Sequence, residues 1–210
     1  MVNSQKLYLF LYWKNPQPFI MSSDLEFQIH GNLAKNKTLI KNQKMQNELN
    51  QKGYGENNNG NYFLNTFETL YLLYLKKLKL QKGNRIIDFD TLMQICIKVD
   101  EDIFTKFLIF RDLRTRGYVV KEGFGFGSDF RVYERGNFGT KSAKYLVFAL
   151  NEGTQEKIGQ IQKNIFEITQ MGKEPIIAVI ERRGEIIYYK ISKMNFHENK
   201  PDLKMKDFNF

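Results

Sequence analysis

The residue types best suited to acid–base, nucleophilic or metal chemistry are few in this chain, and they lie apart. His30 and His197 are distant in sequence, and neither has a neighbouring metal ligand. Cys96 is the single cysteine, which excludes an intrachain disulfide, and its apolar neighbours favour a buried thiol. Carboxylates are scattered singly at predicted helix starts, and no serine stands in a nucleophile elbow. Metal-dependent hydrolysis and a Ser-His-Asp triad therefore have no support.

The glycine-rich segment 123–127 is the other stretch with a possible chemical role. It reads Gly-Phe-Gly-Phe-Gly, but it lacks the Lys-Ser/Thr pair of a phosphate loop and the spacing of a dinucleotide fingerprint. Predicted strands flank it on both sides. We expect a tight turn or a bulge there.

Cleavage of a phosphodiester by its own 2′-hydroxyl makes smaller demands on a protein. It needs a base for that hydroxyl, an acid for the leaving oxygen and a cation for the developing charge. Tyrosine, histidine and lysine can fill these three roles without a metal or a cofactor. Residue types alone do not show which tyrosine, histidine or lysine of this chain would take these roles.

The composition favours a folded protein with a polyanionic partner. A hydrophobic content of 42% supports one large domain or two small ones. The net charge of +9 favours nucleic acid, although an ordinary basic surface would give the same number. No stretch is apolar enough to span a membrane and the start lacks a signal peptide, so we expect a soluble, cytoplasmic protein with no membrane partner.

The first hundred residues are expected to alternate short strands with helices. Strands are predicted between Leu7 and Ile40, with a break at His30–Asn32, and a polar helix over 44–51. The Asn-rich segment 53–61 is expected to be a loop.

The clearest helix of this half follows Asn65. Asn65 can cap it, and Glu68, three residues later, can accept a hydrogen bond from the Asn65 backbone, which together form a capping box. Its apolar face could stack nucleobases, but on an amphipathic helix such a face is expected to be core: Leu70, Tyr71, Tyr74, Leu75 and Leu78. Asp88 or Asp90 is expected to open a short helix through Ile97.

The second half is expected to be a helix, three strands, a helix and a hairpin. The first helix starts at Asp100 or Asp102 and ends at Gly117. The later elements are strands over 118–120, 130–133 and 145–150, a helix from Thr154 to Gly172, and strands over 176–180 and 185–191. We therefore predict an α+β protein, with an N-terminal mixed α/β domain (1–100) and a C-terminal domain (101–210) whose central mixed sheet is flanked by helices.

Three motifs in this second half carry a family resemblance. Residues 111–123 read Arg-Asp-Leu-Arg-Thr-Arg-Gly-Tyr-Val-Val-Lys-Glu-Gly, residues 129–136 read Asp-Phe-Arg-Val-Tyr-Glu-Arg-Gly, and residues 144–147 read Lys-Tyr-Leu-Val. The region 102–191 resembles the catalytic domain of the archaeal-type tRNA-splicing endonucleases, and 44–80 more weakly resembles their N-terminal domain. The resemblance implies a nuclease fold and metal-independent cleavage at bulge-helix-bulge junctions, giving 2′,3′-cyclic phosphate and 5′-hydroxyl ends.

The resemblance also assigns site residues, and it exposes three departures. Tyr133 corresponds to the family's catalytic tyrosine and Lys173 to its lysine, but Ser142 stands where the family has histidine. Serine cannot donate a proton near neutral pH as imidazolium does. The family's RNA-clamping arginine is replaced by Phe166, and its acidic hairpin tip reads Glu-Arg-Arg-Gly-Glu at 181–185.

We therefore interpret the chain as a structural, non-catalytic or impaired subunit of a hetero-oligomeric tRNA-splicing endonuclease, inactive alone. The implied partners are a catalytic subunit, in a heterotetramer, and precursor tRNA. The strand 185–191 and the hairpin Arg182–Gly184 are the candidate interface pieces, since an uncovered edge strand is an aggregation risk.

Two alternatives stay open. One is an active RNA endonuclease that uses another acid, such as Lys141 or His197. The other is a non-catalytic RNA-binding protein with a nuclease-derived fold. The sequence does not determine the RNA-binding residues, the partner or the role of the tail 200–210.

Overall fold

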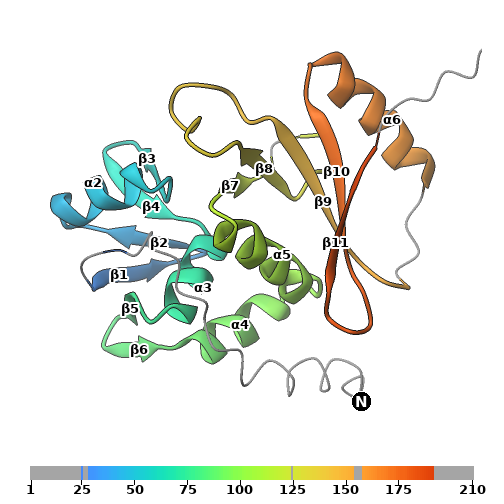
Figure 1. Ribbon diagram of the computed structural model, residues 1–210. Helices are drawn as coiled ribbons and strands as arrows, with labels where there is room; N and C mark the ends of the chain where they lie inside the picture. The colour runs from blue at the N-terminus through green and yellow to red at the C-terminus, as the bar shows by residue number, and fades with distance from the viewer. Residues whose placement is uncertain (1–24, 26–27, 124, 154–157, 192–210) are drawn as a thin grey trace, which may run out of the picture.

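The computed structural model describes residues 25, 28–123, 125–153 and 158–191, which form two β-sheets and five helices (Figure 1). The strands predicted before residue 25 and the tail 200–210 lie outside these residues. The helices are α2 (Gln43–Gln51), α3 (Thr66–Tyr74), α4 (Phe89–Ile97), α5 (Ile103–Thr115) and α6 (Ile158–Gln170). No helix within this part of the chain is long and apolar enough to cross a membrane.

The N-terminal sheet has six strands in the order β3-β4-β2-β1-β5-β6. They are β1 (Ile29–Ala34), β2 (Lys37–Ile40), β3 (Glu56–Asn58), β4 (Asn61–Leu64), β5 (Leu78–Lys82) and β6 (Arg85–Ile87). The central pair, β1 and β5, is parallel and the other pairs are antiparallel. The sheet is therefore mixed, and it lies in the half for which strands alternating with helices were predicted.

The predicted break at His30–Asn32 is wrong, because these residues lie within β1. Gly31 is required there by close packing and not by a turn. A Cβ atom at Gly31 would lie 2.4 Å from the Thr38 Cγ2 of the neighbouring strand. A glycine inside a strand often marks such a close approach.

The predicted loop over 53–61 is also wrong in part, since β3 and β4 form a hairpin there. Its two-residue turn, Asn59-Gly60, has positive φ at both positions (52° and 80°). This is the geometry for which Asn-Gly is favoured, because it matches the twist of the flanking strands. The Asn-Gly dipeptide was thus a local signal for this hairpin.

The predicted starts of α3, α4 and α5 are confirmed, whereas Thr154, the predicted start of the last helix, lies outside the described residues. The Asn65 side chain accepts from the Glu68 backbone N–H and the Glu68 carboxylate accepts from the Asn65 N–H, so the capping box forms. Asp88 caps α4 through the Thr91 N–H. Leu78, predicted on the face of α3, instead opens β5, because the chain turns at Lys76 with φ of 57°.

The C-terminal sheet has five strands in the order β11-β10-β9-β8-β7. They are β7 (Val119–Glu122), β8 (Phe130–Tyr133), β9 (Tyr145–Asn151), β10 (Glu174–Ile180) and β11 (Ile186–Lys190). Only β9 and β10 are parallel, so this sheet is mixed too. Helix α5 packs on one face and α6 on the other (Figure 1), which confirms the predicted α+β class.

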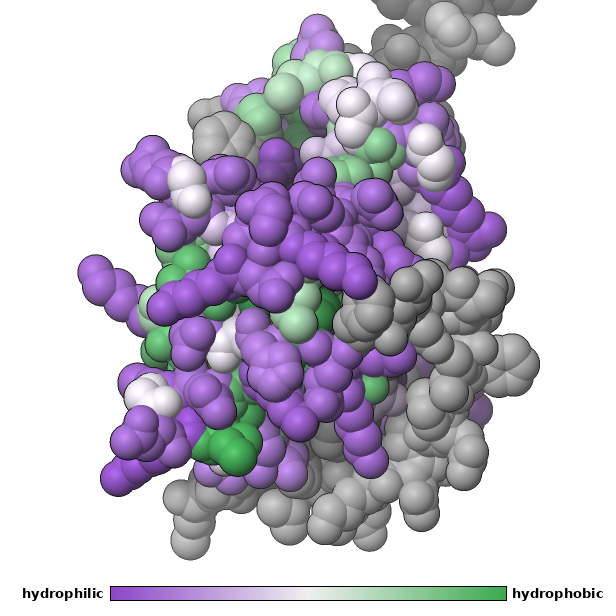
Figure 2. Space-filling model, turned by 90° about the vertical axis from the view of Figure 1, so that its left-hand side faces the viewer, coloured by the Kyte–Doolittle hydropathy of each residue, from purple (hydrophilic) through white to green (hydrophobic). Residues whose placement is uncertain are grey.

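The two sheets share one hydrophobic core. Phe67 of α3 packs its ring against Phe110 of α5 and Phe130 of β8, at centroid distances of 5.9 and 5.0 Å. The apolar face of α3 is buried, with Leu70 at 0% and Tyr71 at 7% exposure, so it serves as core, as expected. The left-hand side of the molecule is largely hydrophilic, with small hydrophobic patches (Figure 2). The proposed division at residue 100 remains a prediction.

Candidate active site and the domain junction

Three neighbouring strands of the C-terminal sheet bring the sequence-predicted site residues to one end of the sheet, which we call the Tyr133 edge. Strand β8 ends at Tyr133, and β9 and β10 begin beside it, with Val132 opposite Tyr145 and Tyr145 opposite Glu174. The row continues through backbone hydrogen bonds from Lys144 N to the Val132 carbonyl and from Glu174 N to the Lys144 carbonyl. Residues 133 and 173 are thus two strand spacings apart, roughly 10 Å.

Tyr133 lies on the face of the sheet that α6 covers. Side chains alternate along a strand, and Arg131 is paired with Leu146, which packs on Ile168 of α6. The half-buried Tyr133 ring contacts Phe138 edge-on, at a centroid distance of 5.1 Å. The position of Tyr133 at the end of β8 therefore keeps its ring at this edge.

Lys173 and Ser142 meet directly. The Lys173 ammonium donates to the Ala143 carbonyl at 2.6 Å and to the Ser142 hydroxyl at 3.5 Å. Lys173 follows Gly172, which has φ of 68° and ends α6, and its own N–H bonds the Ile168 carbonyl. The end of the helix therefore aims the lysine at the loop before β9.

Lys144, the neighbouring cation in this row, forms ion pairs with two carboxylates. Its ammonium lies 2.5 Å from Glu134 and 3.8 Å from Glu174. The hydrogen bond from Lys144 lowers the pKa of Glu134 below its ordinary value. This pair leaves Lys173 as the lysine directed at Ser142.

The structure supplies no imidazole to this edge from the residues it describes. His30 is exposed on β1 of the other sheet, and His197 lies outside the described residues. Lys141 is exposed in the loop before Ser142. The arrangement can orient a phosphate through Lys173 and offer a phenol, but Ser142 is not a proton donor near neutral pH.

Other sequence-predicted features lie around this edge. Phe166 is 52% exposed on α6, where the resemblance placed an arginine. The β10–β11 hairpin is confirmed, and Arg182 at its tip is tied to Glu152 by a backbone N–H donation at 2.8 Å. Among the described strands β11 is at the edge of its sheet, and the Tyr189 side chain on it is 51% exposed. Cys96 is half-buried and burial raises the pKa of its thiol, which fits an unreactive packing residue.

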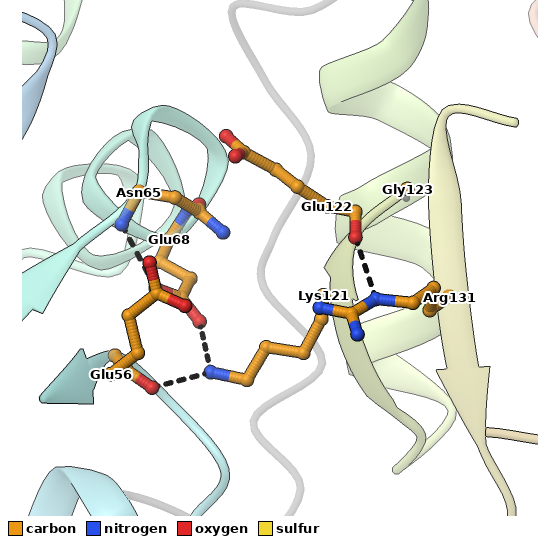
Figure 3. Close-up of a pocket in the computed structure, with 8 residues that line it drawn as sticks. Glu56, Asn65, Glu68, Lys121, Glu122, Gly123 and Arg131 are labelled. Atoms are coloured by element: carbon orange, nitrogen blue, oxygen red, sulfur yellow. Dashed lines mark hydrogen bonds and ion pairs between the residues drawn. The ribbon is translucent and has the colours of Figure 1, made fainter. Parts of the chain in front are cut away.

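The domain junction contains a polar cluster that sequence reasoning missed. Lys121 of β7 reaches into the N-terminal half, where its ammonium bonds Glu68 at 2.8 Å and the Gly55 carbonyl at 2.7 Å (Figure 3). Glu68 is 1% exposed and also completes the capping box of α3. The capping motif was visible in the sequence, but nothing local pointed from Lys121 to a carboxylate 53 positions away.

A cavity of about 170 Å³ opens beside this ion pair. Arg131 lies along it and donates from Nε to the Glu122 carbonyl at 2.9 Å. The lining residues are Gly55, Glu56, Asn65, Glu68, Lys121, Glu122, Gly123 and Arg131. Within the described residues no group of three His, Cys, Asp or Glu side chains could hold a metal ion.

Comparisons with known proteins agree across both halves of the chain. Residues 103–188 match the family described as tRNA intron endonuclease, catalytic C-terminal domain, and residues 29–93 match its N-terminal domain. A tRNA-splicing endonuclease of Thermococcus onnurineus is 31% identical over 177 residues, covering 84% of this chain and 100% of the relative. One from Methanococcus vannielii is 35% identical over 144 residues, covering 68% of this chain and 81% of the relative.

Proposed function

Because the chain belongs to the tRNA intron endonuclease family, we propose that it is a structural subunit of a tRNA-splicing endonuclease that works only with a histidine-bearing partner. The single observation that carries this proposal is the contact between Lys173 and Ser142. The serine stands beside the lysine, where an acid–base group would be needed. The site therefore has a cation and a phenol but no proton donor matched to neutral pH.

The chemistry of the complete reaction explains why this omission matters. Attack of a 2′-hydroxyl on the adjacent phosphate requires removal of one proton and delivery of another to the leaving 5′-oxygen. Imidazole is the side chain suited to both proton transfers near neutral pH, and none lies at this edge among the described residues. A partner subunit would supply the cutting site, and this chain would help to assemble it.

The assembly surface we propose is the edge of the C-terminal sheet at β11. The next strand position beyond β11 is empty among the described residues, and half of the Tyr189 surface is exposed there. The hairpin tip is presented beyond the same edge, with Arg183 exposed. A partner strand or loop at this edge would cover backbone groups that otherwise form an open template.

The test is cleavage of a precursor-tRNA transcript with a bulge-helix-bulge junction, without added metal. This chain is assayed alone and together with a histidine-bearing subunit of the same family. We expect cleavage only in the mixture, with the two subunits co-eluting in size-exclusion chromatography. Cleavage by this chain alone, abolished by Tyr133→Phe, would overturn the proposal in favour of an active enzyme that uses another acid.

A further inference from the structure

The N-terminal sheet has one buried face and one open face. The buried face packs on the shared core, and its residues are at most 8% exposed: Ile29, Thr38, Ile40, Tyr62, Leu64, Leu78, Leu80 and Ile87. Strand register places the alternate residues on the other face. That open face carries exposed side chains on three neighbouring strands: His30 and Asn32 on β1, Lys79 and Gln81 on β5, and Ile86 on β6. Register also places the half-buried Leu39 of β2 and Phe63 of β4 on this face.

The part of the open face formed by β1 and β5 is polar and mostly able to donate hydrogen bonds. His30 is paired with Lys79, and Asn32 with Gln81, so two amides and two basic groups lie side by side on neighbouring strands. Ile86 is the large apolar side chain most exposed there, at 77%. The cores of protein–protein interfaces are depleted in lysine and enriched in aromatic residues, so this composition does not favour a protein partner.

Further cations lie at one end of the sheet. Alternation puts Lys82 on the side of Leu80 and Arg85 on the side of Ile87, so these two cations lie at the rim of the open face and not on it. Strands β1 and β5 are parallel neighbours, so the turns that follow them lie at the same end of the sheet. The first turn carries Lys35, and the second lies between Lys82 and Arg85, all three exposed. No ion pair involves Lys35, Lys79, Lys82 or Arg85 in the part of the chain that the structure describes.

The acidic residues of this half are largely neutralised within the protein. Residues 29–93 contain ten Lys and Arg side chains against five Asp and Glu side chains. Of the carboxylates, Glu68 is paired with Lys121, Glu56 is paired with Lys37 at 2.9 Å, and Asp88 caps α4. The electrostatic potential around Lys82 is therefore positive, and it attracts a polyanion.

We propose that this end of the N-terminal sheet binds the RNA substrate, with Lys82 and Arg85 on phosphates at the rim, Lys79 on a phosphate from the open face, and Asn32 and Gln81 on riboses or bases. Lysine and arginine contacts to phosphates position a nucleic acid, and amide side chains contact both backbone and base edges. The inference rests on the proposed function, which makes the ligand an RNA. It adds a binding surface away from the Tyr133 edge, so this chain would hold precursor tRNA while a partner cuts it.

The experiment measures binding of a fluorescent precursor-tRNA transcript to the full-length chain by anisotropy, with no partner present. The variant Lys82→Glu/Arg85→Glu is compared with Lys41→Glu/Lys98→Glu, which changes exposed residues elsewhere by the same charge. We expect the first variant to bind at least about tenfold more weakly near 0.1 M salt, and to lower the slope of log K against log salt by about 2. The control variant should keep the wild-type slope.

A second variant, Asn32→Ala/Gln81→Ala, keeps the charge and tests the face itself. We expect weaker binding with an unchanged salt slope, because these amides contact no phosphate charge in the proposal. Equal binding by the Lys82/Arg85 variant and its control would overturn the inference, as would absence of RNA binding by the wild-type chain. Normal RNA binding combined with lost association to the partner subunit would also overturn it, and would identify the face as a protein interface.

These outcomes are separate from those of the proposed function. If the mixture with a partner fails to cleave while the isolated chain binds RNA through this face, the structural-subunit proposal fails and the binding surface stands. If the mixture cleaves and the Lys82/Arg85 variant binds and cleaves like its control, the RNA-binding surface is wrong and the structural-subunit proposal stands.

Discussion

The Lys173 ammonium and the Ser142 hydroxyl lie 3.5 Å apart, although 31 positions separate them in the chain. The contact forms because α6 ends at Gly172 next to the loop that precedes β9. A side chain at position 142 is therefore presented to the lysine at the edge where Tyr133 ends its strand. Restoring an imidazole at this position is the most direct test of the site.

We predict that Ser142→His gives the isolated chain measurable cleavage of a bulge-helix-bulge transcript. A positioned acid or base contributes about 10²- to 10⁴-fold, so the gain should exceed about 100-fold over wild type. Single-turnover kinetics without metal would measure it. Ser142→Ala is the matched control and should stay inactive, and Tyr133→Phe in the Ser142→His background should remove the gain. No gain would mean that position 142 does not face the scissile phosphate.

The buried ion pair at the domain junction should dominate the stability of that junction. Replacing Lys121 by Met leaves the Glu68 carboxylate buried without its cation, which costs about 3–5 kcal/mol in such sites. Urea unfolding followed by circular dichroism would give the free energy of unfolding. Lys37→Met, at the exposed pair with Glu56, is the control and should cost less than about 1 kcal/mol. Equal losses in the two variants would show that the Lys121 pair does not hold the junction.

Stability should fall in alkaline solution through buried tyrosines. Burial raises the pKa of Tyr71 to about 12, and it raises the pKa of Tyr62 and Tyr188 in the same direction. The folded form then keeps a proton that the unfolded form releases near pH 10, so the contribution is intact below about pH 9 and is lost as the pH rises toward 12. For Tyr71 alone the loss is on the order of 2–3 kcal/mol.

Urea midpoints between pH 8 and pH 12 would measure this effect. Tyr71→Phe should show a shallower decline than wild type, because one of the groups that titrate differently is gone. Tyr189→Phe is the matched control, since Tyr189 is 51% exposed on β11. A decline as steep in the Tyr71 variant as in wild type would contradict the prediction.

A charge at the β11 edge should weaken assembly with the partner subunit. Tyr189→Glu places a carboxylate on the surface that we propose the partner covers. Because burying an unpaired charge is costly, analytical ultracentrifugation of the mixture should show at least about tenfold weaker association. Val99→Glu changes a side chain that is 78% exposed at a different site and should leave association unchanged. Equal association of both variants would place the partner elsewhere on the molecule.

Much of the fold follows from local sequence. The Asn65–Glu68 capping box, the Asp88 cap and the strand Phe130–Tyr133 are all present as predicted. The errors have local explanations as well. The glycine at position 31 serves packing between strands, and the Asn59-Gly60 turn was a hairpin signal inside a segment too polar to resemble strands.

The sequence by itself determined the helices, most of the strands and the substitution of serine at position 142, because caps, turns and periodicity act over a few residues. Only the tertiary structure decided that Ser142 meets Lys173, that Lys121 neutralises Glu68, and that one face of the N-terminal sheet stays open. These relationships depend on strand order and on the packing of elements distant in the chain. Register between distant strands is set by the burial of whole faces, which no short segment encodes.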